Sequence, residues 1–243
     1  MLDREDKLTQ EIFREDAYAK RCEAVVSAAG ENGIELDRTV FYAAGGGQPG
    51  DTGALVRADG SRLVIVETRR DRETGAHLHI PADGEPLPEA GETVTAEIDW
   101  DRRHRLMRMH TAMHLLCSLV PEGVTGGSVG ETKSRLDFNL PDRTLDKERL
   151  TEDLNRLVAG DHGVSTRWIT EEELAAQPDL VRTMSVKPPT GSGKVRLVSI
   201  EGVDLQPCGG THVARTGEIG RVSIGKIENK GRHNRRVNIL LEA

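Results

Sequence analysis

The sequence predicts an α+β protein of two domains, a small N-terminal β-barrel domain over residues 1–100 followed by an α+β domain over residues 101–243. Two observations support this division. Short apolar runs broken by glycine, proline and aspartate fill the first part, a rhythm typical of a small barrel or sandwich. Apolar residues spaced by three and four, the helical period, begin near Trp100.

Four apolar runs predict the strands of the first domain. They are bounded by residues that favour turns, such as those at 32–33, 45–53 and 81–84. Because the whole chain has three Phe, two Tyr and two Trp, the core must consist mainly of Val, Ile, Leu and Ala. The strand runs lie at residues 24–26, 39–42, 63–66 and 94–98.

The second domain is predicted to combine helices with a sheet. An amphipathic helix over 106–119 should end before Pro121. A second helix is expected over 145–159 with Gly160 as its stop, and a third opens at the capping box of Thr170. Strand-like runs supply the sheet at 135–140, 195–200, 221–227 and 237–241.

Composition excludes several classes of protein. No apolar run approaches the roughly 18 residues of a membrane span, and the N-terminus lacks a secretory pattern. Cys22, Cys117 and Cys208 are odd in number and far apart, which argues against a disulfide framework. We therefore expect a soluble, cytoplasmic protein without membrane association.

The net charge of −7 argues against indiscriminate binding to nucleic acid, but the charge is unevenly distributed. The segment 215–236 carries seven Lys or Arg against two Glu. A second basic stretch, 102–108, runs into His110. Both stretches adjoin possible metal ligands and could attract a phosphate-bearing substrate. The alternative is an ordinary solvated surface.

Two separated pairs of residues offer four metal ligands. His110 and His114 lie one turn apart on the predicted helix, so their imidazoles share a face. Cys208 and His212 flank a glycine pair that suits a tight loop. Each pair alone is common by chance, but thiolate and imidazole together are the donors that zinc prefers. The quartet therefore favours a zinc site.

Two better-known motifs are excluded. The metalloprotease helix requires Glu directly after its first histidine, where this chain has Thr111. The segment 189–195 invites comparison with a phosphate-binding loop, but Val195 stands where Ser or Thr would hold magnesium. We predict no nucleotide cofactor, and a glycine turn that leads into the strand at 195–200.

A concentrated glycine segment, Gly45, Gly46 and Gly47, precedes Gln48. Successive glycines permit backbone conformations closed to other residues and allow a ligand or another chain segment to approach closely. The simpler interpretation is a turn. Gln48 is notable because its side chain can both donate and accept hydrogen bonds.

Three motifs together resemble a known family. They read FYAAGGGQPGDTG at 41–53, HTAMHLL at 110–116 and DLQPCGGTHV at 204–213. In this order, across nearly the whole chain, they resemble the editing domain of alanyl-tRNA synthetase and, more closely, the medium-length, free-standing AlaX trans-editing proteins. The resemblance implies hydrolysis of the ester joining serine to alanine tRNA, and leaves open whether glycine is removed as well. A pocket for alanine rejects an added hydroxyl poorly, so a second hydrolytic site is needed.

The resemblance also implies roles for residues. Gln48 and Thr125 are candidate catalytic residues, and by alignment Thr125 stands where the synthetase domains have glutamine. Thr111 is a candidate pocket neighbour. The expected zinc ligands are His110, His114, Cys208 and His212. The expected substrate-binding residues are Gly45, Gly46, Gly47, Thr211, Lys226, Lys230, Arg232, Arg235 and Arg236.

Two alternatives stay open. One is an RNA-binding module that zinc merely stabilises, without catalysis. The other is editing of mischarged threonine tRNA, whose editing domains share both ligand pairs, although the glycine-rich first domain argues against it. We expect the partner to be the acceptor end of mischarged tRNA, and the protein to be a monomer.

Overall fold

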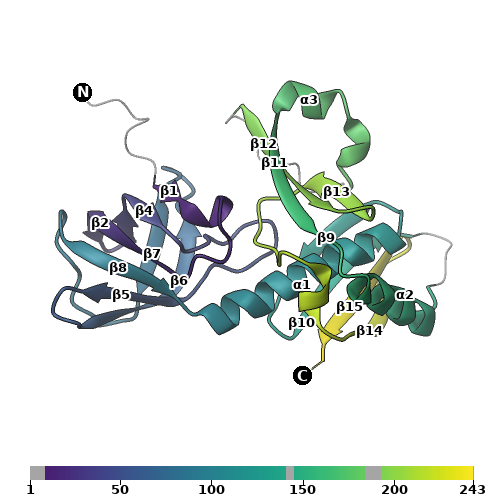
Figure 1. Ribbon diagram of the computed structural model, residues 1–243, viewed down its shortest axis with the longest axis horizontal. Helices are drawn as coiled ribbons and strands as arrows, with labels where there is room; N and C mark the ends of the chain where they lie inside the picture. Colours follow the sequence, from purple (N-terminus) through teal and green to yellow (C-terminus); the bar gives the residue numbers. More distant parts are fainter. Residues whose placement is uncertain (1–8, 141–144, 184–192, 243) are drawn as a thin grey trace. The chain divides into compact units, whose positions relative to one another are not determined.

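The computed structural model describes residues 9–140, 145–183 and 193–242 (Figure 1). Contacts divide the chain into two compact units. The first comprises Met1–Gly45 and Pro49–His104, and the second comprises Gly46–Gln48 and Arg105–Ala243. The short segment Gly46–Gln48 thus belongs with the second unit, although its neighbours in sequence belong with the first.

The first unit contains a closed six-stranded barrel, which confirms the predicted barrel and is consistent with the α+β class. All neighbouring strands pair antiparallel. In their order around the barrel the strands are β2 (Arg21–Gly30), β3 (Gly33–Leu36), β7 (His77–Pro81), β6 (Arg62–Arg70), β5 (Gly53–Arg57) and β8 (Thr93–Ile98).

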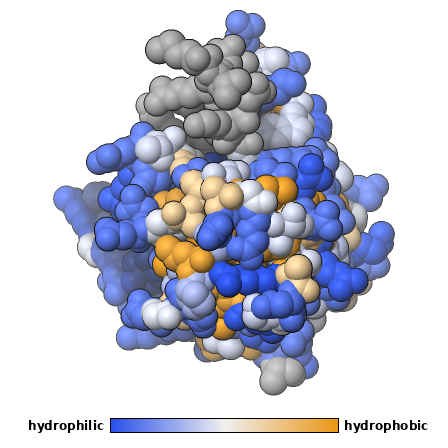
Figure 2. Space-filling view, turned by 90° about the vertical axis from the view of Figure 1, so that its left-hand side faces the viewer, coloured by the Kyte–Doolittle hydropathy of each residue, from blue (hydrophilic) through white to orange (hydrophobic). Residues whose placement is uncertain are grey.

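Alternating burial along the strands builds the barrel core. In β6, Leu63 and Ile65 are buried while Val64 and Val66 face solvent. The core consists of Val, Ile, Leu and Ala with Phe41, as composition predicted. Figure 2, which looks at the left-hand side of Figure 1, shows small hydrophobic areas in orange among polar side chains.

One predicted strand is much shorter than expected. The run at 39–42 contributes only its first residue to a strand, β4 (Arg38–Thr39), which pairs in parallel with β1 (Gln10–Glu11). The physical reason is that the backbone N–H of Tyr42 donates to the Asp51 carboxylate, at 2.6 Å, instead of joining a ladder. Phe41 and Tyr42 are buried nonetheless.

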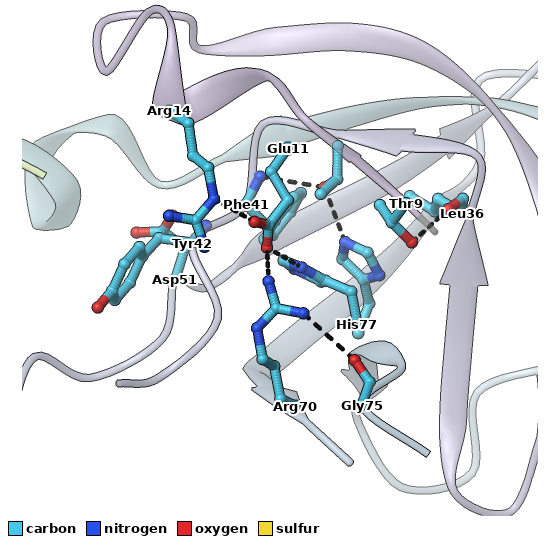
Figure 3. Close-up of polar contacts among 12 residues, drawn as sticks. Thr9, Glu11, Arg14, Leu36, Phe41, Tyr42, Asp51, Arg70, Gly75 and His77 are labelled. Carbon is cyan, nitrogen blue, oxygen red and sulfur yellow. Dashed lines mark hydrogen bonds and ion pairs between the residues drawn. The ribbon is translucent and has the colours of Figure 1, made fainter. Parts of the chain in front are cut away.

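A buried carboxylate ties β1 to the barrel (Figure 3). Glu11 forms ion pairs with Arg14 and Arg70, and its Oε1 lies 3.0 Å from Nδ1 of the buried His77. Burial alone would raise the pKa of Glu11, but His77 and the two guanidinium groups outweigh it and hold that pKa at about 2. Arg70 also donates to the carbonyl of Gly75.

His79 is a buried, neutral histidine inside the barrel. Its Nδ1 lies 3.0 Å from the carbonyl of Ile34, and its Nε2 lies 2.8 Å from the hydroxyl of Thr39. Both ring nitrogens are therefore satisfied when Nδ1 carries the proton and Nε2 accepts. Burial, with a smaller contribution from His77, lowers the pKa of His79 to about 3.

A fully buried ion pair joins the residues after the glycine segment to the first turn of the following helix. Arg103 is 0% exposed and Asp51 is 1% exposed. The Arg103 Nε lies 3.0 Å from both carboxylate oxygens, and its Nη2 donates to the carbonyl of Val40 at 2.7 Å. These bonds satisfy a guanidinium that would otherwise be costly to bury.

Among the described residues, two sheets, two whole helices and most of a third helix belong to the second unit. In the first sheet the neighbouring strands are β14 (Val222–Asn229), β15 (Asn234–Leu241), β10 (Lys133–Asn139) and β9 (Val124–Ser128). In the second sheet they are β11 (Val164–Thr170), β12 (Lys194–Ile200) and β13 (Asp204–Pro207). The helices are α1 (Trp100–Leu119), α2 (Lys147–Ala159) and α3 (Glu171–Ala175). The 3₁₀ turns among all the described residues are η2 (Ile12–Arg14), η3 (Pro178–Leu180) and η4 (Thr216–Ile219).

The predicted helices and strands of this unit are confirmed, with two corrections. α1 is not simply amphipathic, because every residue from 109 to 117 is buried. Gly160 ends α2 as predicted, but with φ −64°, and the left-handed residue is the next one, Asp161, with φ 47°. The capping box of Thr170 is present in full. The glycine turn predicted at 189–192 lies outside the described residues.

Two further observations concern the chain as a whole. Cys22, Cys117 and Cys208 are all free thiols, so the expectation of no disulfide framework is confirmed. Within the described residues, none of the helices combines the length and apolar character needed to cross a membrane.

Lowering the pH from 7 to 5 should destabilise the protein through His79. Its pKa lies below that of an unfolded histidine, so the unfolded chain binds the extra proton and stability is lost as pH falls from about 6.5 towards 3. The expected loss is about 2 kcal/mol at pH 5, measured by urea unfolding. His79→Asn, which can still donate to Ile34, should flatten this dependence, and an unchanged slope would contradict the assignment.

Asp51→Asn should lower the free energy of unfolding by about 3–5 kcal/mol, because it leaves the buried Arg103 guanidinium uncompensated. Denaturant unfolding measures the change. Asp83→Asn, in an exposed turn, is the matched control and should change little. Equal stability of the two variants would show that the pair does not brace this part of the fold.

Candidate metal centre

Helix α1 supplies the first two donors of the candidate site. His110 and His114 lie one turn apart, with ring centroids separated by 5.4 Å, and each is 6% exposed. Because the surrounding residues of α1 are buried as well, the imidazoles face the interior of the second unit. This placement follows from the i, i+4 spacing.

The other two donors lie in the loop that follows β13. The N–H of Cys208 donates to the carbonyl of Arg196 at 3.0 Å. In return, Nη1 of Arg196 donates to the carbonyls of Cys208, at 3.0 Å, and Gly210, at 2.9 Å. Arg196 is itself buried, so its guanidinium satisfies loop carbonyls that water cannot reach. The loop is thereby fixed against β12.

Gly210 allows the loop to approach α1. A Cβ at this position would lie 2.2 Å from Cε1 of His110, closer than any real contact. A larger residue would therefore displace the imidazole. Of the glycine pair between Cys208 and His212, Gly210 is thus required for close packing, whereas a Cβ at Gly209 would meet no atom within 4 Å.

The four predicted ligands converge on one point. The Sγ atom of Cys208 lies 3.5 Å from Nε2 of His110 and 3.3 Å from Nε2 of His212. The His212 ring centroid lies 4.4 Å from that of His110 and 4.7 Å from that of His114. One donor atom from each of the four residues lies within 4.8 Å of all the others.

This geometry fits a metal ion. A tetrahedral ion with metal–nitrogen bonds of about 2.0 Å and a metal–sulfur bond of about 2.3 Å holds sulfur and nitrogen roughly 3.6 Å apart. The two sulfur–nitrogen separations measured here are close to that value. Thiolate with three imidazoles is a donor set for a transition metal rather than for calcium or magnesium.

Gln48 fixes the orientation of His110. Its Oε1 lies 2.7 Å from Nδ1 of His110 and also accepts from the N–H of Thr211 at 3.1 Å. Its Nε2 donates to the hydroxyl of Thr211 at 2.9 Å. A proton held on Nδ1 leaves the Nε2 lone pair available to a metal. Gln48 therefore connects the ligand helix to the ligand loop.

The other two imidazoles have equivalent partners. Nδ1 of His114 lies 3.0 Å from Oδ2 of Asp204, and Gln206 donates to the same carboxylate at 2.8 Å. Nδ1 of His212 lies 3.1 Å from the hydroxyl of Thr111, which itself donates to a backbone carbonyl. Every Nδ1 is thus occupied, and every Nε2 is directed to the common point.

The electrostatics of the cluster favour metal-binding protonation states at two positions. Burial raises the pKa of the Cys208 thiol, but His110 and His212 outweigh it and bring that pKa well below its ordinary value. Burial lowers the pKa of His212 to about 3, so this imidazole is neutral. His114 differs: burial lowers its pKa, but Asp204 and Cys208 raise it to about 9. A metal must displace that proton.

The glycine segment delivers Gln48. Gly47 has φ +83°, and a Cβ there would lie 2.9 Å from the carbonyl oxygen of Gly127. Its own carbonyl accepts from the N–H of Val129 at 2.8 Å. Gly46 also has positive φ, and the Gly45 carbonyl accepts from the Tyr42 hydroxyl. The substrate-binding role of Gly45, Gly46 and Gly47 stays a prediction.

Thr125 is not one of the residues gathered around the cluster by hydrogen bonds. Its hydroxyl lies 3.1 Å from the carbonyl of Asp137 and 3.1 Å from Oδ1 of Asn234, on the neighbouring strand β10 and at the start of β15. These contacts give it a structural role in the sheet. Its catalytic role stays a prediction.

The predicted tRNA-binding cations lie on or between β14 and β15. Arg236 donates twice to Asp137, at 2.7 and 2.9 Å, which raises the pKa of the guanidinium. Lys230 forms an ion pair of 2.7 Å with Glu228. Of the predicted set, the others are Lys226, Arg232 and Arg235. The Lys230 pair is partly exposed and therefore weak, whereas the side chains of Arg236 and Asp137 are only 26% and 14% exposed. Binding of phosphate by these cations stays a prediction.

Sequence reasoning missed Asp204, Gln206 and Arg196. A signal for the first two was present, because residues two apart in a strand share a face and β13 leads directly to Cys208. Nothing in the sequence distinguished Arg196 from other strand arginines. Its role depends on the path of the loop.

Comparison with known families defines the class of protein. The family described as Threonyl and Alanyl tRNA synthetase second additional domain matches residues 195–238, which include Cys208 and His212. The family described as tRNA synthetases class II (A) matches residues 6–102. The fold and the site thus lie in a relative of synthetase domains.

Full-length relatives are more specific. The chain is 36% identical to the alanyl-tRNA editing protein AlaX-M of Methanosarcina acetivorans, over 96% of this chain and 99% of that protein. It is 36% identical to AlaX-M of Saccharolobus solfataricus, over 95% and 98%. It is also 37% identical to alanine–tRNA ligase of Halobacterium salinarum, over 89% of this chain and 24% of that protein. The chain belongs to the AlaX-M family of alanyl-tRNA editing proteins.

Gln48→Ala and Asp204→Ala should each weaken binding of a divalent metal by about 10–100-fold, because each frees one Nδ1 and loosens one imidazole. Competition with a chromophoric chelator measures the affinity. Asp179→Ala, exposed in the same unit, is the control and should bind metal normally. Unchanged affinity in both variants would mean that these contacts do not orient the ligands.

Proposed function

We propose that this protein hydrolyses mischarged alanine tRNA, releasing serine and also glycine from its acceptor end, with zinc held by the quartet of histidine and cysteine ligands. Alanyl-tRNA editing proteins are aminoacyl-tRNA deacylases, and the chain belongs to that family. The observation that carries the proposal is the convergence of His110, His114, Cys208 and His212 with every Nδ1 already occupied.

The reaction is hydrolysis of a carboxylic ester. Zinc at this site would supply Lewis-acid polarisation of the ester carbonyl and an anchor for the amino acid. Water adds to the carbonyl carbon, the bond from that carbon to the ribose oxygen breaks, and the ribose oxygen takes up a proton. The four side chains would fill the tetrahedral positions of a bound ion, so water or substrate would need a further position or would displace one donor.

Gln48 acts in this proposal as a positioning residue. Its amide oxygen contacts Nδ1 of His110 and accepts from the N–H of Thr211, and its amide nitrogen donates to the Thr211 hydroxyl. Thr211 uses its lone pair to accept from Gln48, which leaves its hydroxyl proton to donate. A serine hydroxyl offers an acceptor for that proton, whereas alanine offers none, which agrees with editing of serine.

His114→Ala and Cys208→Ala should each lower the rate of serine release from seryl-tRNA(Ala) by at least about 100-fold, because each removes a ligand from the site. Release of radiolabelled serine measures the rate, with and without a chelator in the wild-type assay. Cys117→Ala removes the neighbouring buried thiol and should keep most activity. Full activity in a metal-free His114→Ala, Cys208→Ala double variant would overturn the role of zinc.

Parallel substrates separate the remaining possibilities. Release of serine and glycine but not alanine from alanine tRNA supports the proposal. Release of serine from threonine tRNA instead would favour the alternative editing specificity. Tight tRNA binding without release of any amino acid would indicate a module that zinc only stabilises. The monomeric state, testable by light scattering, and the cytoplasmic location stay predictions.

A further inference from the structure

The outer face of the four-stranded sheet in the second unit is polar. Along β10 the even-numbered residues are buried, whereas the odd-numbered ones, beginning with Lys133, are exposed or half-buried. Alternation of this kind marks a sheet with one face on the core and one open to solvent. The open face carries charged and hydrogen-bonding side chains, together with Leu240, which is 37% exposed and lies opposite Lys133.

A hollow of about 160 Å³ lies on this face. Register explains its composition, because Arg135 pairs with Ser128 on one side and with Asn238 on the other, so these three side chains form one row. Lys133 lies two residues along from Arg135 on the same face. The residues that line the hollow are Ser128, Lys133, Ser134, Arg135 and Asn238.

The lining presents donors and no carboxylate. Lys133 makes no ion pair with any described residue, and Ser128 offers a hydroxyl. Arg135 contributes a guanidinium that shares only Nη1 with Asp137, at 2.6 Å. The rim is rigid, because the buried Asn238 donates to the carbonyl of Lys226 at 2.6 Å and the Ser134 hydroxyl accepts from a turn N–H at 3.0 Å.

The charged residues around the hollow are positive on balance. The next row of the face pairs Asp137 with Arg236, and Glu228 lies opposite Arg236 on β14. Two carboxylates there face Arg135, Arg236 and Lys230. Together with Lys133, these residues comprise four cations and two carboxylates, and the excess of positive charge attracts an anion to the hollow.

Strand β9 connects this hollow to the metal cluster. Ser128 in the hollow precedes Val129, whose N–H donates to the carbonyl of Gly47 at 2.8 Å. Gly47 precedes Gln48, whose Oε1 lies 2.7 Å from His110. The path from Ser128 in the hollow to the metal-ligand candidate His110 thus comprises two hydrogen bonds and two peptide bonds.

We propose that the hollow formed by Ser128, Lys133, Arg135 and Asn238 binds a backbone phosphodiester of the tRNA close to its esterified end. The inference rests on the proposed function for the identity of the RNA. Lys133 supplies a point charge and Arg135 a planar pair of donors, the combination that proteins use for phosphate. The contact positions the RNA and reads no base.

The test compares a Lys133→Ala, Arg135→Ala double variant with wild type over a series of salt concentrations. The substrates are seryl-tRNA(Ala) and a seryl ester of adenosine, which has no phosphodiester. The double variant should raise KM for the tRNA about tenfold at low salt, with kcat unchanged. It should also flatten the slope of log affinity against log salt by about 0.7–0.9, because the contact that neutralises one phosphate is lost. Hydrolysis of the adenosine ester should be unaffected.

The control removes two arginines from α2, Arg149 and Arg156, which are 81% and 73% exposed and lie outside the hollow. Arg149→Ala, Arg156→Ala should leave KM and the salt slope at wild-type values. An unchanged KM and slope in the Lys133→Ala, Arg135→Ala variant would overturn the proposal. If wild type releases no serine, the proposed function fails, and fluorescence anisotropy with uncharged tRNA still tests the hollow by the same salt slopes.

Discussion

The site depends on one constraint: three buried imidazoles must keep their Nε2 atoms free while every other polar atom is satisfied. A histidine ring has two nitrogens, so an Nε2 directed to a metal requires a partner at Nδ1. Gln48, Thr111 and Asp204 fill that requirement from three different parts of the second unit. None of the three is a metal ligand, yet each determines where a ligand points.

The same constraint explains why the glycine segment is constructed as it is. Gln48 reaches His110 only because Gly47 adopts a left-handed conformation and packs against the backbone of β9. Gly210 fulfils a matching need in the ligand loop, where any side chain would collide with His110. Three residues after Gln48, Asp51 is fixed by the buried guanidinium of Arg103. The chain that leaves the segment is therefore anchored.

Under the proposed function, the second unit separates the hydrolytic site from the surface that binds the RNA. The buried interior of the unit holds soft donors, and the solvent-facing side of its four-stranded sheet carries cations and hydroxyls. The end of β9 adjoins both, since Ser128 lines the hollow and the next residue, Val129, donates to the carbonyl of Gly47. A substrate with a small reacting end and a long anionic body, such as an aminoacyl-tRNA, suits that division. The acidic remainder of the chain would limit contact with other nucleic acids.

The sequence by itself determined the barrel, the three helices, roughly half of the strands and the four candidate ligands, because these depend on local periodicity and on short spacings such as i, i+4. It also located Gln48. Only the tertiary structure decided what Gln48 does, since its partners lie 62 and 163 residues away. The roles of Asp204 and Arg196 also depend on contacts with residues distant in sequence, so only the structure showed them. The strand expected at 39–42 is short because the Asp51 carboxylate binds the backbone N–H of Tyr42. Hydrogen bonds between buried polar groups that lie far apart in the chain produce no periodic pattern in a single sequence.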